Sequence, residues 1–175
     1  MPAPDLIILV GFMGAGKSAV GRLLARRLGR CFVETDEMIS ARAGRSIPEI
    51  FRESGEAGFR ALEAEAVDLL RLKHGDVVAT GGGLPCREGR VELLRSLGTV
   101  IWLKGDFAEM YERARRSGER PMLAERPVDE VEALCRAREP HYGRAHLTIE
   151  TRGLTVDQVA SRILTALRQP RGAPV

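Results

Sequence analysis

The sequence is short of the features that mark several classes of protein. Its three cysteines, Cys31, Cys86 and Cys135, lie far apart and form no closely spaced Cys or His pair, so we expect free thiols and no zinc site. Its apolar runs are too short to span a bilayer, and residues 1–5 lack the basic start of a signal peptide. We therefore expect a cytoplasmic protein with no membrane partner.

Aromatic residues make up only 5% of the chain, and the net charge of +3 is modest. Basic residues are spread along the sequence without interleaved aromatics, so nucleic acid is not an expected partner. The mildly basic balance instead fits a small anionic substrate. Lysine is also scarce, since Lys17, Lys73 and Lys104 stand against 24 arginines, and this makes the position of each lysine informative.

The order of apolar and amphipathic stretches predicts one α/β domain over residues 1–175. Short apolar runs alternate with stretches of helical period, a pattern typical of a parallel sheet covered by helices. The pattern breaks at residues 36–62, where successive helical stretches without a strand predict a helical insertion. Residues 169–175, with two prolines and a glycine, predict a disordered tail. The five expected strands cover residues 6–10, 31–34, 76–79, 99–103 and 146–150.

Two of the expected helices are marked by both caps and apolar stripes. Ser46 with Glu49, and Thr155 with Gln158, have the spacing of a capping box at a helix start. The first box is expected to open a short helix that ends near Phe51, before a longer one. The inward stripes are expected to comprise Phe59, Leu62, Ala66, Leu69 and Leu70 in the longer helix, and Val156, Val159, Ala160, Ile163, Leu164 and Leu167 in the last.

Residues 11–18 read Gly-Phe-Met-Gly-Ala-Gly-Lys-Ser and fit the phosphate-binding pattern GxxxxGK(S/T). They lie between an apolar strand and an amphipathic helix, which makes a chance glycine-rich turn the weaker alternative. Glycine removes the Cβ atoms that would keep backbone N–H groups away from a phosphate chain. We expect Lys17 to reach the β- and γ-phosphates and the Ser18 hydroxyl to bind Mg²⁺. The expected nucleotide-binding residues of this segment are Gly14, Ala15, Gly16, Lys17, Ser18 and Ala19.

Further polar and glycine residues follow the other predicted strands, where open parallel sheets bind ligands. Asp36 is either the N-cap of a helix or a carboxylate that orients an acceptor hydroxyl and takes its proton. The residues alone favour the cap, and the nearby phosphate loop favours the second role. Gly81, Gly82 and Gly83 form either a flexible turn or, as we favour, a close approach of ligand to backbone. Arg152 follows the last strand.

Three arginines are candidates for binding anions. Arg138 shares an apolar helical stripe with Val131 and Tyr142, and an inward guanidinium needs an anionic partner. Arg60 lies beside the stripe of its helix, where an ion pair with Glu63 is the alternative role. For Arg120, a solvated basic loop and a loop that closes over a nucleotide are equally consistent with the residues.

In combination, these motifs resemble the shikimate kinase family, within the nucleoside-monophosphate-kinase-like branch of P-loop folds. The resemblance runs from about Leu6 to Leu167. A generic P-loop kinase would share only residues 11–18. The other motifs are Thr-Asp at 35–36, Gly-Arg-Ser-Ile at 44–47, Phe-Arg-Ala-Leu-Glu at 59–63, Thr-Gly-Gly-Gly at 80–83, Arg-Pro-Met-Leu at 120–123 and Arg-Glu-Pro-His-Tyr at 138–142.

The resemblance implies a three-layer fold with a five-stranded parallel sheet, a substrate-binding region at about 36–62 and a lid at about 115–126. It implies ATP-dependent phosphorylation of the 3-hydroxyl of shikimate, with Mg²⁺ as cofactor. By similarity, Asp36 is the base, and Arg60, Arg138 and the glycines at 81–83 bind the acceptor. Arg120 lies near the transferred phosphate, and Arg152 contacts adenine.

One departure from the family and several alternatives accompany this interpretation. Many members carry an aspartate where this chain has Glu34, and the resemblance gives that residue a place with Ser18 in the Mg²⁺ shell. The alternatives are a kinase of another small hydroxylated acid such as gluconate, a nucleoside monophosphate kinase, or a nucleotide switch that is not a kinase. We expect a monomer whose partners are ATP and shikimate.

Overall fold

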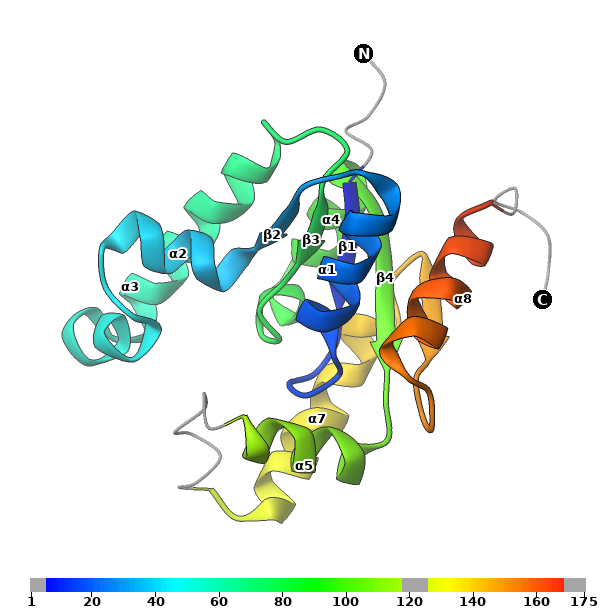
Figure 1. The fold of residues 1–175 in the computed structure, drawn as a ribbon. Coiled ribbons are helices and arrows are strands. Elements are labelled where there is room, and N and C mark those ends of the chain that lie inside the picture. Colours follow the sequence, from blue (N-terminus) through cyan, green and yellow to red (C-terminus); the bar gives the residue numbers. More distant parts are fainter. Residues whose placement is uncertain (1–5, 118–125, 169–175) are drawn as a thin grey trace.

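The computed structural model describes residues 6–117 and 126–168, and Figure 1 shows their arrangement. The strands form one parallel five-stranded sheet in the order β2-β3-β1-β4-β5, which confirms the predicted fold class. The strands are β1 (Leu6–Val10), β2 (Phe32–Glu34), β3 (Val77–Ala79), β4 (Gly98–Lys104) and β5 (Leu147–Glu150). The helices are α1 (Lys17–Leu28), α2 (Thr35–Ala43), α3 (Ile47–Leu70), the short 3₁₀ helix η1 (Leu84–Cys86), α4 (Arg90–Leu97), α5 (Phe107–Arg116), α7 (Val128–Tyr142) and α8 (Val156–Arg168).

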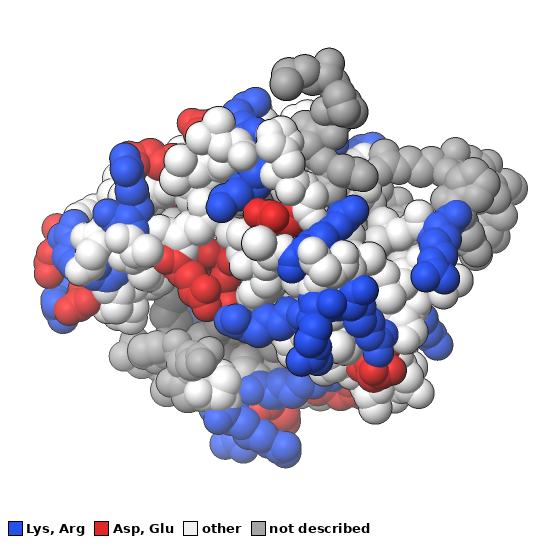
Figure 2. Space-filling model, turned by 45° about the horizontal axis from the view of Figure 1, so that its top comes forward, with Lys and Arg blue, Asp and Glu red and all other residues white. Residues whose placement is uncertain are grey.

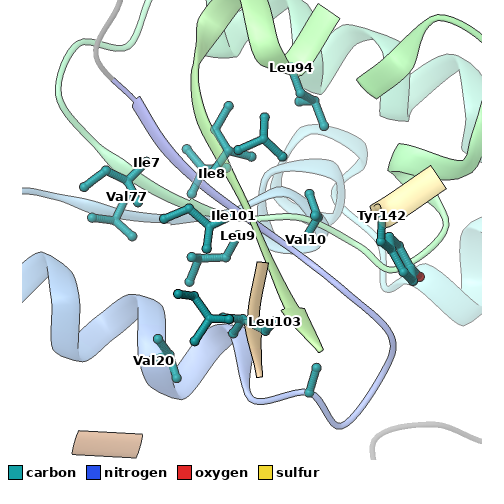
Figure 3. Close-up of a cluster of buried hydrophobic side chains, with 14 of the residues drawn as sticks. Ile7, Ile8, Leu9, Val10, Val20, Val77, Leu94, Ile101, Leu103 and Tyr142 are labelled. Carbon is teal, nitrogen blue, oxygen red and sulfur yellow. The ribbon is translucent and has the colours of Figure 1, made fainter. Parts of the chain in front are cut away.

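Strand β1 lies at the centre of the sheet and of the core. Its residues are at most 5% exposed, because helices cover a parallel sheet on both faces. It pairs with β3 and β4, so that Ile7 lies opposite both Val77 and Thr99. Figure 3 shows the apolar side chains of β1 packed together with Val77 from β3, Val20 from α1 and Leu94 from α4. The loop that follows β1 is thus attached to a fully buried central strand.

Helices α2 and α3 pack against each other and form a separate lobe beside the sheet (Figure 1). The lobe has a small core of its own, made of Ile39, Ile50, Phe59 and Ala66. The two helices expected after Ser46 are present as the two parts of α3, which meet at a kink at Gly55, where φ is 63° and ψ is −169°. The expected capping box is present, since the backbone N–H of Ser46 donates to Glu49 Oε2 at 2.8 Å.

Two residues that were predicted to face inward, Leu69 and Val156, are exposed in the structure. Leu69 is 39% exposed, because the buried side of α3 follows the spacing Phe59, Glu63, Ala66 and Leu70, which leaves Leu69 outside it. Val156 is 40% exposed because it is the first residue of α8, before the helix lies against the core. Across residues 6–117 and 126–168, no helix is long and apolar enough to cross a membrane.

Candidate active site

The loop between β1 and α1 is shaped by its glycines and packs on α5. Gly14 has a φ of 74°, a region that side chains disfavour, and a Cβ there would lie 2.0 Å from the carbonyl oxygen of Met110. Only glycine therefore fits this position. Gly16 is the left-handed N-cap of α1, so the first N–H groups of that helix point into the loop.

Lys17 is the first residue of α1, and its side chain folds back over the loop. The residue is 8% exposed, and its Nζ donates to the carbonyl oxygens of Gly11 at 2.8 Å and Phe12 at 2.9 Å. These bonds hold a full positive charge inside the loop, next to the N-terminus of α1. Both features favour binding of a phosphate chain.

Ser18 and Glu34 lie together at the edge of this loop. The Ser18 hydroxyl donates to Glu34 Oε1, and Glu34 Oε2 accepts a bond from Arg22 at 3.2 Å. Among the described residues, no cluster of three or more His, Cys, Asp or Glu side chains could hold a metal ion by itself. The Ser18–Glu34 oxygen pair nevertheless fits Mg²⁺, which takes hard oxygen donors and usually completes its shell with water and substrate phosphates.

Asp36 lies in the first turn of α2 and is not its N-cap. The cap is Glu34, and the helix begins at Thr35, so the capping interpretation of Asp36 is wrong. The carboxylate lies against Gly81, where a Cβ would be 2.6 Å from Asp36 Oδ1. Thr35 is fully buried, and its hydroxyl oxygen accepts a bond from the Gly81 N–H at 2.9 Å. These contacts place the carboxylate beside the glycine turn that follows β3.

The three glycines at 81–83 provide space rather than unusual backbone angles, since none of them has a positive φ. A Cβ at Gly83 would lie 3.4 Å from Arg138 Nη2 and 3.6 Å from Arg60 Nη1. A Cβ at Gly82 would lie 3.5 Å from Arg138 Nη1. The two guanidinium groups therefore approach the same point. We call the space bordered by Gly82, Gly83 and the guanidinium groups of Arg60 and Arg138 the cradle, and a side chain at either glycine would extend into it.

Arg60 reaches this cradle with its guanidinium already held by acidic neighbours. Its Nη1 lies 3.1 Å and 3.0 Å from the oxygens of Glu63, which is 4% exposed. Its Nε and Nη2 lie 3.3 Å and 3.2 Å from Glu56 Oε1, which also binds Arg87 at 2.9 Å. The ion pair with Glu63 and a place at the candidate site are thus both realised.

Arg138 differs from Arg60 in its partners. Its guanidinium carbon lies 5.7 Å from the ring centroid of Phe12, a residue of the phosphate loop. No carboxylate in the described part of the chain forms an ion pair with it. Its half-buried charge is therefore available for an anionic ligand, as the helical stripe predicts.

Some expected site residues are not brought into this cluster. Arg120 and most of the predicted lid lie outside the described residues, as does the tail at 169–175. Arg152 is exposed in the turn after β5, and no hydrogen bond or ion pair links it to another described residue.

Figure 2 shows one face of the molecule, on which basic and acidic side chains are mixed.

Sequence reasoning missed Arg113 and the burial of Glu63. Arg113 donates to the Gly14 carbonyl oxygen at 3.3 Å and pairs with Glu109 at 2.8 Å. It follows Met110 by one helical turn, and that spacing is a signal once Met110 is known to lie on the loop. Glu63 has the helical spacing of the buried residues Phe59, Ala66 and Leu70, and this spacing was a signal of its burial.

Comparison with known proteins gives a consistent result. The family model described as shikimate kinase (SKI) matches residues 13–168. The chain is similar to the shikimate kinase of Symbiobacterium thermophilum, with 45% identity over 167 residues that cover 93% of this chain and 96% of that one. It is 44% identical to the shikimate kinase of Ralstonia nicotianae over 163 residues, which cover 92% of this chain and 86% of that one. A solved shikimate kinase from Acinetobacter baumannii, in complex with shikimate, superposes with a TM-score of 0.87 at 38% identity and covers 95% of this chain and 93% of that one.

Proposed function

Because the chain belongs to the shikimate kinase family, we propose that its site transfers the γ-phosphoryl group of ATP to the 3-hydroxyl of shikimate. The products are shikimate 3-phosphate and ADP. The observation that carries the acceptor half is the approach of Arg60 and Arg138 to one point beside Gly83. Two guanidinium forks suit the planar carboxylate of such an acid.

The donor half of the site is the loop with the start of α1. Backbone N–H groups of residues 14–19 bind the phosphate chain in this proposal, and Lys17 exchanges its two carbonyl partners for phosphate oxygens. Arg113, which touches Gly14, adds positive charge at the same loop.

Ser18 and Glu34 would hold Mg²⁺. The ion supplies neutralisation of the charge on the β- and γ-phosphate oxygens when it is bound. Arg22 pairs with Glu34 at 3.2 Å and with Glu37 at 3.0 Å, so it neutralises part of the negative charge beside this pair.

Asp36 completes the acceptor half. In the proposed reaction, the acceptor oxygen forms a bond to the γ-phosphorus while the bond from that phosphorus to the bridging oxygen of ADP breaks. The proton of the hydroxyl passes to the Asp36 carboxylate. Gly81 leaves the room that lets this carboxylate face the site.

Several parts of the account rest on the family resemblance alone. These are the role of Arg120 at the transferred phosphate, the contact of Arg152 with adenine, the lid at about 115–126 and the substrate-binding region at about 36–62. A cytoplasmic location and a monomeric state also stay predictions.

A coupled assay of ADP release tests the proposed function. The acceptors are shikimate, gluconate and a nucleoside monophosphate, each with ATP and Mg²⁺. We expect turnover with shikimate and a rate near background with the others. Turnover of gluconate or a nucleotide with none of shikimate would replace the proposal by a different kinase, and slow ATP hydrolysis independent of every acceptor would favour a switch.

A further inference from the structure

Tyr142, the last residue of α7, is buried against the glycine turn of the candidate site. It is 1% exposed, and its hydroxyl donates to the carbonyl oxygen of Gly82 at 2.7 Å. Its ring packs beside Trp102 at a centroid distance of 6.0 Å. It follows Arg138 by four residues, so both side chains leave the same face of α7 toward the turn.

Most backbone N–H and C=O groups of the turn at residues 81–83 are hydrogen-bonded. The Gly81 N–H donates to Thr35, the Gly81 carbonyl accepts from the Leu84 N–H at 3.2 Å, and the Gly83 carbonyl accepts from the Cys86 N–H at 3.2 Å. Two donors remain, since the N–H groups of Gly82 and Gly83 find no acceptor among the described residues. They lie beside the guanidinium groups of Arg60 and Arg138, where an anion would satisfy them.

Tyr142 controls the direction of one of these donors. A peptide unit is planar, so the Gly82 carbonyl and the Gly83 N–H lie in one plane and point in opposite directions. The bond from Tyr142 to that carbonyl therefore also fixes the Gly83 N–H. We propose that Tyr142 is a positioning residue of the acceptor site, which sets the Gly82–Gly83 peptide so that its N–H and the Arg138 guanidinium bind the same carboxylate. This inference rests on the proposed function.

Among the described residues, one other side chain donates to the Gly82 carbonyl. It is Cys86, whose Sγ lies 3.6 Å away and is a weak donor. Burial raises the pKa of the Tyr142 phenol far above its ordinary value, so the hydroxyl stays protonated and continues to donate.

The test is Tyr142→Phe, which keeps the ring and its packing and removes one oxygen atom. We expect the KM for shikimate to rise about tenfold while the KM for ATP stays within about twofold, the size expected when one buried hydrogen bond at a ligand site is lost. Cys135→Ala is the matched control, because it removes a buried atom from the same helix without reaching Gly82. It should lower the melting temperature and leave both KM values unchanged.

A second readout separates positioning from packing. An analogue of shikimate with a carboxamide in place of the carboxylate should lose less affinity in Tyr142→Phe than shikimate does, because the misplaced N–H and guanidinium act on the carboxylate. An unchanged shikimate KM, or equal rises in the KM values of both substrates, would overturn the inference while the function stands. If the wild type releases no ADP with shikimate, the proposed function fails and the inference falls with it.

Discussion

The guanidinium group of Arg60 lies across both carboxylate oxygens of Glu63, with Nη1 3.1 Å from one and 3.0 Å from the other. The two residues are three positions apart on α3, and Glu63 is 4% exposed. A buried carboxylate is costly without a partner, so this pair fixes the direction of Arg60. The same guanidinium also borders the cradle at Gly83, where a Cβ would lie 3.6 Å from Nη1 and 3.7 Å from Nη2. The pair thus joins the stability of the α2–α3 lobe to the geometry of the acceptor site.

Replacing Arg60 by lysine should affect both properties. Lysine keeps the charge but cannot bind Glu63 and an acceptor carboxylate with one planar fork. We expect the KM for shikimate to rise at least about tenfold and the free energy of unfolding to fall by about 1–3 kcal/mol. Steady-state kinetics and urea unfolding measure the two effects. Arg42→Lys, at an exposed pair with Glu65, is the control and should change neither. An unchanged KM in Arg60→Lys would remove Arg60 from the site.

Asp36→Asn should abolish transfer while leaving the nucleotide site intact. The amide keeps the shape of the side chain and cannot accept the hydroxyl proton, so we expect kcat to fall by about 10²–10⁴-fold. The affinity for ATP, measured by calorimetry, should stay nearly unchanged. Asp68→Asn removes an exposed carboxylate that pairs with Arg71 and should leave kcat unaltered. Retained turnover in Asp36→Asn would refute the role of Asp36 as the base.

Glu34→Gln should increase the amount of Mg²⁺ that the reaction needs. The substitution keeps the contact distance to Ser18 but removes the negative charge that the cation favours. We expect the Mg²⁺ concentration for half-maximal activity to rise by about tenfold or more, in the range found when a group that supports a metal site is lost. Glu34→Asp keeps the charge and should stay close to the wild type. Identical Mg²⁺ titrations of the wild type and Glu34→Gln would exclude Glu34 from the metal shell.

The Cys135 thiol predicts a specific dependence of stability on pH. Burial, followed by the nearby Glu139 carboxylate, raises its pKa from the ordinary value of 9.0 to about 11. The folded protein therefore holds this proton in a range where the unfolded chain releases it. The contribution to stability is complete below pH 9 and is lost as the pH rises to 11, and it amounts to about 1–3 kcal/mol. Unfolding free energies at pH 8 and pH 11 should fall more for the wild type than for Cys135→Ala. Equal falls would contradict the shift.

Much of the fold was predictable from local features of the sequence, namely motif spacing, apolar runs and helical periodicity. The phosphate loop was predictable because its spacing, the preceding apolar run and the following amphipathic helix agree. The α2–α3 lobe was predictable because successive helical stretches follow one another without a strand, and its core residues Phe59 and Ala66 stand on the predicted stripe, whereas Ile39 and Ile50 were not predicted. The break between a short and a longer helix after Ser46 was predicted, but it lies at Gly55 and not near Phe51, because Gly55 adopts the non-helical φ of 63° that ends the first helix.

The sequence brought forward residues that lie close together in the structure, such as Asp36, Arg60, Gly83 and Arg138, but it did not reveal their contacts. Arg138 stood out because a charge shared an apolar stripe, and the structure indeed leaves it without a carboxylate partner among the described residues. The reason for Gly81 was not visible, because the atom that would clash with a Cβ belongs to Asp36, 45 positions earlier in the chain. The Tyr142–Gly82 bond joins elements about 60 residues apart, and only tertiary structure reveals such a pair.

A crystal structure with shikimate and an ATP analogue tests the central claim most directly. The account predicts density for the carboxylate of shikimate between the guanidinium groups of Arg60 and Arg138, next to the N–H of Gly82 or Gly83. It also predicts the 3-hydroxyl within hydrogen-bond distance of Asp36. Shikimate bound with its carboxylate away from both arginines, or with Asp36 out of reach of every hydroxyl, would contradict it.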